Sequence, residues 1–244
     1  MHPTETKPGS NLCTVTDPLE SLMANRYEHK DSPYSSHSLL LSTLPVNGQG
    51  KQILDVGCWD GSVSSLYLAR GFKVVGIEQS RHHNLPQPIE LIEANLNDGL
   101  PHVSGTFNYI ICADVLEHLL NPQAVLSQLR NHLSSDGKLL ASLPNSGHWF
   151  FRLMVLCGYF PKQDNGLFDR THLHFFTLDG WRELFHQSGY TIESVTPTSL
   201  PVSKVFPSWS RWLTVGIGER AQSLLGKIWL RLFAYQFVIE AKIK

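Results

Sequence analysis

The chain lacks an apolar run that could cross a bilayer, since nowhere do about eighteen apolar residues follow one another without a break. It also lacks a strong net charge. The formal charge is −1, so we expect no global basic field of the kind that drives nonspecific binding to nucleic acid. The first residues are polar and carry prolines, which is not the pattern of a signal peptide. These absences predict no nucleic-acid partner and at most peripheral membrane contact.

Cysteine is scarce, and the spacing of the four cysteines contains no C-x-x-C pair. A reduced interior and a cytoplasmic location are the simplest interpretation. A chain of 244 residues with 42% hydrophobic content is long enough to bury one sizeable core, but two full domains are not expected. Because residues 1–24 are rich in Thr, Pro and Ser, we predict a flexible tail there and a single domain over 25–244.

Two glycine-rich phosphate signatures are also missing: neither G-x-G-x-x-G nor a phosphate loop with Gly-Lys-Ser/Thr is present. In their place, an apolar run leads into the spacing Asp55-x-Gly57-x-Trp59-x-Gly61, and helical apolar spacing follows from Val63 to Arg70. A carboxylate at the end of a strand would repel phosphate but suits a cationic amino-acid group. The pattern predicts a strand, a tight loop and a helix that cradle a nucleotide-type cofactor without a pyrophosphate.

Short apolar strands alternate with helical patterns along most of the chain. The alternation predicts an α/β fold with a mostly parallel sheet, helices on both faces, and ligands at the carboxyl ends of the strands. A helix precedes the first strand, from Tyr34 to Leu44, and another covers Arg182 to Gln187. The predicted strands are Ile53 to Val56, Lys73 to Ile77, Glu90 to Glu93, Tyr109 to Ala113, Lys138 to Leu143, Thr191 to Val195 and Gln236 to Lys242.

The Asp55 to Gly61 loop resembles motif I of the class I S-adenosylmethionine methyltransferases. This resemblance implies a Rossmann-like, seven-stranded sheet with a reversed last strand, which fits a closing strand reached through a long intervening segment. Trp59 stands where the family usually has a glycine, so its side chain should point outward from the turn. S-adenosyl-L-methionine is the cofactor that the resemblance implies.

The same resemblance places the cofactor along three strand ends. Asp55, Gly57 and Gly61 would shape the methionine end, and Glu78 would accept hydrogen bonds from the ribose hydroxyls. Asn95 stands where the family usually has an aspartate for the adenine amino group, and its amide oxygen can still accept; an ordinary Asn-rich turn is the alternative. The complete predicted cofactor set is Asp55, Gly57, Cys58, Trp59, Gly61, Glu78, Gln79, Asn95, Leu96 and Ala113.

Ala113 is followed by Asp114-Val115-Leu116-Glu117-His118, which is similar to the D-x-L-E-H signature of ubiquinone-type and related small-molecule methyltransferases. On a helical turn, Asp114, Glu117 and His118 would share one face beside the cofactor. They could orient the acceptor or take its proton, cap a helix, or hold a divalent cation. We predict catalytic roles for Asp114 and His118, and no metal.

A second segment, residues 166–177, resembles the G-x-x-D-R-T-H-L-R-F-F-T stretch of bacterial methyltransferases found beside glycosyltransferases, with His174 in the place of the arginine. If the segment is extended, His172 and His174 point to one side, and Leu173 and Phe175 to the other. Histidine side chains ordinarily titrate near neutral pH, which would suit His172 to accept a proton from a hydroxyl during methyl transfer. The alternative is a structural Asp-Arg-Thr-His network.

Two further segments are expected to cap the acceptor site, over about 145–176 and 200–235. Residues 144–160 are too apolar and aromatic for a surface loop, so we predict a helix that walls the acceptor pocket or packs in the core. Over Val205 to Tyr235, aromatic residues alternate with Lys and Arg, which suits a membrane interface or a lipid-linked substrate. Packing against the sheet is favoured there.

These interpretations together predict a methyltransferase that aligns an acceptor oxygen with the methyl carbon of S-adenosylmethionine and removes its proton. The favoured acceptor is a sugar, glycan or lipid-linked intermediate, in line with the 166–177 segment. A small-molecule or quinone-type O-methyltransferase and a noncatalytic cofactor-binding module are the alternatives. The sequence does not indicate an oligomeric state.

Overall fold

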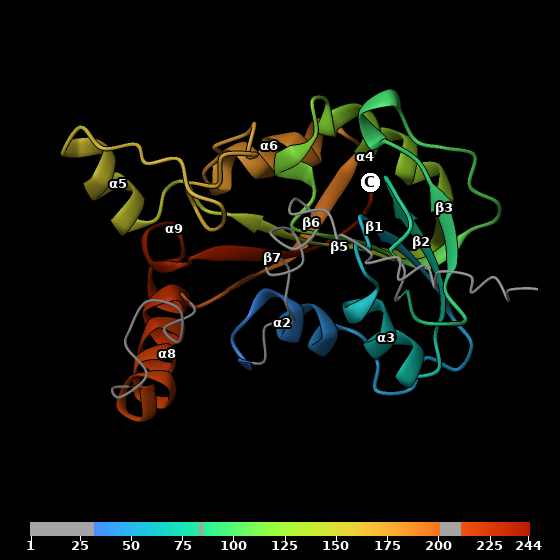
Figure 1. The fold of residues 1–244 in the computed structure, drawn as a ribbon, viewed down its shortest axis with the longest axis horizontal. Helices are drawn as coiled ribbons and strands as arrows, with labels where there is room; N and C mark the ends of the chain where they lie inside the picture. Colours follow the sequence, from blue (N-terminus) through green and yellow to red (C-terminus); the bar gives the residue numbers. More distant parts are fainter. Residues whose placement is uncertain (1–31, 83–84, 201–210) are drawn as a thin grey trace, which may run out of the picture.

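The computed structural model describes residues 32–82, 85–200 and 211–244. Its centre is a seven-stranded sheet with the order β3-β2-β1-β4-β5-β7-β6 (Figure 1). All strands run parallel except β7, which is antiparallel to both of its neighbours. The strands are β1 (Gln52–Val56), β2 (Lys73–Glu78), β3 (Glu90–Glu93), β4 (Phe107–Ala113), β5 (Leu133–Pro144), β6 (Tyr190–Pro197) and β7 (Gln236–Ile243).

Helices cover both faces of this sheet. Figure 1 shows α2 (Ser36–Thr43) and α3 (Ser62–Ala69) on one face, and α4 (Pro122–Leu129) and α6 (Leu178–Gln187) on the other. The remaining helices are α5 (Trp149–Leu156), α8 (Arg211–Ile228) and α9 (Leu230–Phe233), with single 3₁₀ turns at η1 (Leu96–Asp98), η2 (Leu116–His118) and η3 (Arg130–His132). No helix within the three described stretches is long and apolar enough to cross a membrane.

The core divides into two layers because strand side chains alternate between the two faces of the sheet. Leu54 and Ile110 pack into the layer beneath α4 and α6, where Trp181 is fully buried. Their neighbours Ile53 and Ile111 pack into the layer beneath α2 and α3. The central strands β1 and β4 are buried on both faces, which explains their continuous apolar sequences.

The predicted fold class is confirmed, including the reversed last strand. Each predicted strand is found within two residues of its predicted bounds, except that β5 begins at Leu133 instead of Lys138, and the first helix forms as α2. The second helix, α6, begins at Leu178 after the extended Thr177, and it includes the predicted stretch Arg182 to Gln187. A helix also forms within residues 144–160, as α5. The predicted tail, residues 1–24, lies outside the described residues.

Candidate active site

The predicted cofactor residues follow strands that are neighbours in the sheet. β1 pairs with β2 on one side and with β4 on the other, and all three strands are parallel. The carboxyl ends of these strands therefore meet at one edge of the sheet, which is where open α/β folds bind their ligands. This edge brings together the loop after Val56, the end of β2 at Glu78, and the end of β4 at Ala113.

The loop between β1 and α3 is tight and has three residues in the left-handed region of backbone space: Gly57 (φ 73°), Trp59 (φ 51°) and Gly61 (φ 74°). A Cβ atom on Gly57 would lie 2.5 Å from Cγ2 of Val115. Glycine is therefore required at this position by both conformation and space. The loop is thereby held against the segment that follows β4.

Glu78 holds this loop in place through its carboxylate. Its Oε2 accepts a hydrogen bond from the backbone N–H of Trp59 at 2.8 Å, and its Oε1 accepts one from the N–H of Gln79 at 2.8 Å. The Trp59 ring lies against the His82 ring with centroids 4.3 Å apart. The left-handed tryptophan, which departs from the family pattern, is thus supported on both its backbone and its side chain.

Asp55 lies within the protein rather than on the loop surface, with 3% of its area exposed. Its carboxylate accepts a hydrogen bond from the Ser64 hydroxyl on α3. Burial raises the pKa of Asp55 from 3.8 to about 6; the Ser64 hydrogen bond opposes this rise and the charge of Glu78 adds to it. A carboxylate in this environment is ready to be stabilised by a nearby cation.

The other predicted cofactor residues differ in how they face the strand ends. Cys58 turns its thiol inward against Gly76, and burial raises the pKa of that thiol. Gln79 is exposed and Leu96 is buried. Asn95 accepts a hydrogen bond from the N–H of Asn97 at 3.0 Å and so caps η1. This is the Asn-rich turn that the sequence offered as the alternative to adenine binding. A contact between Asn95 and adenine stays a prediction.

Asp114 does not share a helical turn with Glu117 and His118, so that prediction is wrong. The 3₁₀ turn η2 contains only Leu116–His118, and Asp114 precedes it with a left-handed backbone (φ 54°). Its Oδ1 accepts hydrogen bonds from the Ser142 hydroxyl at 2.6 Å and from Nε2 of Gln236 at 3.0 Å. The carboxylate therefore ties the end of β4 to β5 and β7.

Glu117, His118 and His172 form a cluster next to this strand end. The His118 and His172 rings have centroids 4.8 Å apart, and Nε2 of His172 lies 4.0 Å from Oε1 of Glu117. Glu117 is 1% exposed. One ligand atom from each of the three residues lies within 4.8 Å of the other two, so the group could hold a divalent cation. Two predicted catalytic residues, His118 and His172, are thus brought together.

The position of His118 is fixed by a short chain of hydrogen bonds. The Thr171 hydroxyl donates to Oδ1 of Asp169 at 2.7 Å, and Asp169 is buried. Nδ1 of His118 lies 3.0 Å from that hydroxyl oxygen and 3.2 Å from the Thr171 carbonyl. Because the hydroxyl proton is used toward Asp169 and a carbonyl only accepts, Nδ1 must be the donor. The lone pair of His118 is therefore on Nε2.

The segment that carries His172 docks onto η2 through its backbone. The N–H groups of Leu173 and His174 donate to the Glu117 carbonyl at 2.8 and 3.3 Å, and Nε2 of His174 donates to the Leu119 carbonyl at 2.8 Å. His172 and His174 are half-buried on this side, while Leu173 and Phe175 are exposed. The predicted alternation is confirmed, although the segment forms no strand of the sheet.

Sequence reasoning missed two buried polar residues just after β5. Asn145 is fully buried, and its amide donates to the carbonyls of Arg231 at 3.2 Å and Ala234 at 2.7 Å. His148 is 4% exposed and caps α5, and burial lowers its pKa from 6.5 to about 4. Asp169, which orients Thr171, was predicted only as one member of a structural network. Nothing local in the sequence distinguishes buried from exposed positions here.

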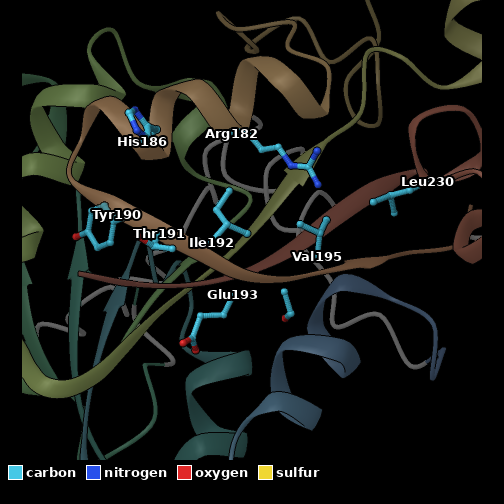
Figure 2. A pocket seen from close by; sticks show the side chains of 9 residues that line it. Arg182, His186, Tyr190, Thr191, Ile192, Glu193, Val195 and Leu230 are labelled. Atoms are coloured by element: carbon cyan, nitrogen blue, oxygen red, sulfur yellow. The ribbon is translucent and has the colours of Figure 1, made fainter. Parts of the chain in front are cut away.

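Two surface hollows border α6. One, of about 470 Å³, is bordered by α6, β6 and α9 (Figure 2), where Arg182 and His186 face the edge strand β6. It contains none of the predicted site residues. The other, of about 370 Å³, lies between the start of α4 and α6 and includes His174 and Phe176.

Comparisons with known proteins agree with this geometry. The family model described as "Methyltransferase domain" matches residues 27–195, which is more than half of the chain. The ubiquinone biosynthesis O-methyltransferase of Glaesserella parasuis serovar 5 is 28% identical over 120 residues, which cover 44% of this chain and 51% of that protein. The chain thus spans about half the length of this curated relative.

Solved structures support the same fold. Burkholderia thailandensis 1,6-didemethyltoxoflavin-N1-methyltransferase, solved with S-adenosylhomocysteine, has a TM-score of 0.56 at 11% identity, covering 93% of this chain and 82% of that one. The [4+2]-cyclase SpnF has a TM-score of 0.53 at 15% identity, covering 85% of this chain and 80% of that one. At these identities the likeness shows the fold alone, and the cyclase illustrates that one fold serves different reactions.

Proposed function

This chain belongs to the methyltransferase domain family, and we propose that it transfers a methyl group from S-adenosylmethionine to a hydroxyl oxygen of a small organic acceptor. One juxtaposition supports this most directly. The loop of Gly57 and Gly61 and the end of β2 lie at the same sheet edge as η2, which carries His118. The proposed cofactor cradle and the proposed base would thus be next to each other.

The cofactor residues would divide the molecule between them. Asp55 would stabilise the cationic amino-acid end, and the carboxylate of Glu78 would exchange its backbone partners for ribose hydroxyls. Asn95 and Leu96 would contact the adenine. The sulfonium group supplies an activated methyl, so little covalent chemistry is required of the protein.

His118 is the residue that we assign to take the acceptor proton. Its Nε2 carries the lone pair because Nδ1 donates toward Thr171, and Thr171 is itself oriented by Asp169. This arrangement keeps one tautomer in place during the reaction. Asp114 would act differently from the role predicted for it, since its contacts with Ser142 and Gln236 suit it to fixing the strand ends.

His172 and Glu117 would assist beside His118. The buried Glu117 carboxylate, 4.0 Å from His172, would stabilise positive charge that develops on either imidazole when the proton is taken. Alternatively, the same donor set of one carboxylate and two imidazoles would suit a divalent cation held by Glu117, His118 and His172, in which case His118 would be a ligand and not the base. A cation there would lower the pKa of an acceptor hydroxyl.

The acceptor class is supported by the curated relatives, which are named for O-methylation in ubiquinone biosynthesis. They favour a small-molecule hydroxyl over the sugar, glycan or lipid-linked acceptor that the sequence placed first. A glycan acceptor stays the second candidate because the 166–177 segment suggested it. Part of the proposed cap, residues 145–176, lies against the histidine cluster through the contact of Leu173 with Glu117.

Cofactor binding is the first test. Isothermal titration with S-adenosylmethionine should give a saturable isotherm, whereas no binding at millimolar cofactor would overturn the proposed methyl transfer. Transfer of a tritiated methyl group to a catechol, compared with transfer to a methyl hexoside, then separates the two acceptor classes. Labelling of the hexoside alone would overturn the small-molecule assignment.

The assignment of the base is tested with histidine variants. His118→Ala should lower kcat by a factor of about 10² to 10⁴ with the cofactor Kd unchanged, and His172→Ala should lower kcat with little loss of cofactor binding. Thr171→Val should give a smaller loss, because it removes the hydroxyl beside Nδ1 of His118 but keeps the ring and the backbone carbonyl. His186→Ala on the exposed side of α6 is the control. Unchanged turnover in His118→Ala would make His118 a structural residue.

A further inference from the structure

Large apolar side chains are exposed together on and just after α5. Only Phe151 is buried among the eight residues of this helix. Leu156 is 84% exposed, and the same segment exposes Trp149, Phe150, Leu153, Val155, Tyr159 and Phe160. Proteins rarely leave contiguous apolar surface of this kind in water unless it binds something.

This surface is held rigidly rather than loosely. The Phe151 ring stacks on Phe168 with centroids 4.5 Å apart and planes at 8°, and Phe160 packs edge-on against Phe168 at 5.4 Å. Phe175 lies 5.1 Å from Phe160 and 6.1 Å from His172. One side of α5 is therefore anchored by aromatic packing close to the histidine cluster, while the other side projects from the body of the protein (Figure 1).

The end of α8 adds to the same end of the molecule. Ile228 is 81% exposed and Trp229 is 57% exposed, and Leu224 and Leu225 are exposed beside them. In Figure 1, α5, α9 and the end of α8 lie together at one extreme of the long axis. Asn145, just before α5, donates to the Arg231 carbonyl of α9, which fixes the two parts to each other. We call residues 149–160 and 224–229 together the apolar end.

The charges within the two stretches that contain the apolar end, 145–163 and 220–235, are all of one sign, and Asp164 and Glu219 lie just outside them. No acidic residue occurs within 145–163 or 220–235, whereas these two stretches contain Arg152, Lys162, Arg220, Lys227 and Arg231, all exposed. Arg231 also pairs with Asp179 on α6. This bias contrasts with the net charge of −1 for the whole chain. A second copy of the chain would bring cations against cations, so self-association is disfavoured here.

We propose that the apolar end docks onto the surface of a membrane that contains anionic lipid. Exposed Trp, Tyr, Phe and Leu side chains enter the boundary between headgroups and acyl chains, and flanking Lys and Arg side chains contact lipid phosphates. The docking is interfacial, since no helix of the described stretches could span a bilayer. For the segment Val205 to Tyr235, the sequence favoured packing against the sheet over contact with a membrane. Tyr235 does pack beside His148, but Trp229 is exposed; Trp209 lies outside the described residues.

Docking of this kind needs no methyl transfer, so it is tested on the full chain without cofactor or acceptor. Sedimentation with vesicles of phosphatidylglycerol and phosphatidylcholine should recover the protein, and pure phosphatidylcholine should recover far less. Raising the salt concentration should weaken the binding because screening shortens the range of the charges. No binding to the anionic vesicles at low ionic strength would overturn the assignment.

Matched variants locate the contact. Leu156→Ser and Val46→Ser replace side chains that are equally exposed, at 84%, but only Leu156 belongs to the apolar end. Leu156→Ser should lower the partition coefficient about tenfold, and Val46→Ser should leave it unchanged. The double variant Lys162→Gln with Lys227→Gln should lower it by more than tenfold, at roughly fivefold for each charge. Thermal melts confirm that each variant is folded.

Two outcomes would refute membrane docking even if the protein sediments with vesicles. Equal binding by Leu156→Ser and the wild-type chain would place the contact elsewhere. Sedimentation equilibrium that shows a dimer, with the dimer lost in Leu156→Ser, would assign the apolar end to a second copy of the chain.

Discussion

Replacement of Asp55 by asparagine should make the protein more stable and its cofactor binding weaker. The carboxyl group is 3% exposed, and burial raises its pKa from 3.8 to about 6. This rise corresponds to about 3 kcal/mol, at 1.36 kcal/mol for each unit of pKa. An asparagine amide is uncharged and its oxygen can still accept from Ser64. The free energy of unfolding above pH 6 should therefore increase by up to about 3 kcal/mol.

The gain should depend on pH in a defined direction. Below pH 3.8 the carboxyl group is protonated in both the folded and the unfolded chain, so Asp55→Asn has no electrostatic effect. Between pH 3.8 and about 6 the unfolded chain ionises first, which lowers the stability of the wild-type protein as the pH rises. Above pH 6 the whole difference is present. Urea denaturation of both proteins at pH 4 and pH 8 measures it.

Cofactor binding by the same variant separates function from stability. If the Asp55 carboxylate stabilises the cationic end of S-adenosylmethionine, the Kd at pH 8 should rise roughly tenfold or more in Asp55→Asn, as for the loss of a charged hydrogen bond. In the wild-type protein, affinity should increase as the pH rises toward about 6 and then level off. A stability gain of the same size at pH 4 and pH 8 would refute burial of charge as its cause. An unchanged Kd would refute the anchoring role.

Three further substitutions test other parts of the site. His148→Asn retains a helix cap but removes a group whose pKa is lowered to about 4. The wild-type protein should lose about 3 kcal/mol of stability as the pH falls from 6.5 to 4, and His148→Asn should not show this loss in urea denaturation. The Trp59→Gly protein should be more stable than the Trp59→Ala protein by about 1 kcal/mol in thermal melts, because the backbone at position 59 is left-handed. Equal stability of the two variants would contradict this conformation. Gly57→Ala should cost about 1 to 3 kcal/mol, and Val115→Ala should partly restore it in a double-mutant cycle, whereas strictly additive effects would show that the two side chains do not meet.

The strands and their order could be predicted because each one is an apolar run bounded by turn residues. β1 and β4 are buried on both faces, so their sequences contain little besides apolar residues, and this signal is local. The helix α6 starts at Leu178, whereas only its continuation over Arg182 to Gln187 was predicted. Its first turn contains Asp179 and Gly180, which are weak helix formers, and tertiary packing of Trp181 overrides that preference.

The site was less predictable because its side chains are oriented by contacts between distant segments. The motif at 114–118 suggested a helical face, but Asp114 turns toward Ser142 and Gln236, and the latter is 122 residues away in the sequence. Likewise, the tautomer of His118 depends on Thr171, which is 53 residues away. No periodicity of the sequence encodes such contacts. The pairing of His118 with His172 was within reach only because both residues were singled out separately.

The departures from ordinary folding preferences are concentrated where the function is proposed. Asp55 places a carboxyl group in the core, and Trp59 and Asp114 adopt left-handed backbone conformations that cost roughly 1 to 3 kcal/mol for each residue. All three residues lie at or just beyond the carboxyl ends of β1 and β4, whereas one left-handed non-glycine residue, Gln49 (φ 49°), precedes β1 at its opposite end. A fold selected only for stability would remove them, since asparagine, glycine and a relaxed turn are available. Their clustering at one edge therefore supports that edge as the place where a ligand compensates for the strain.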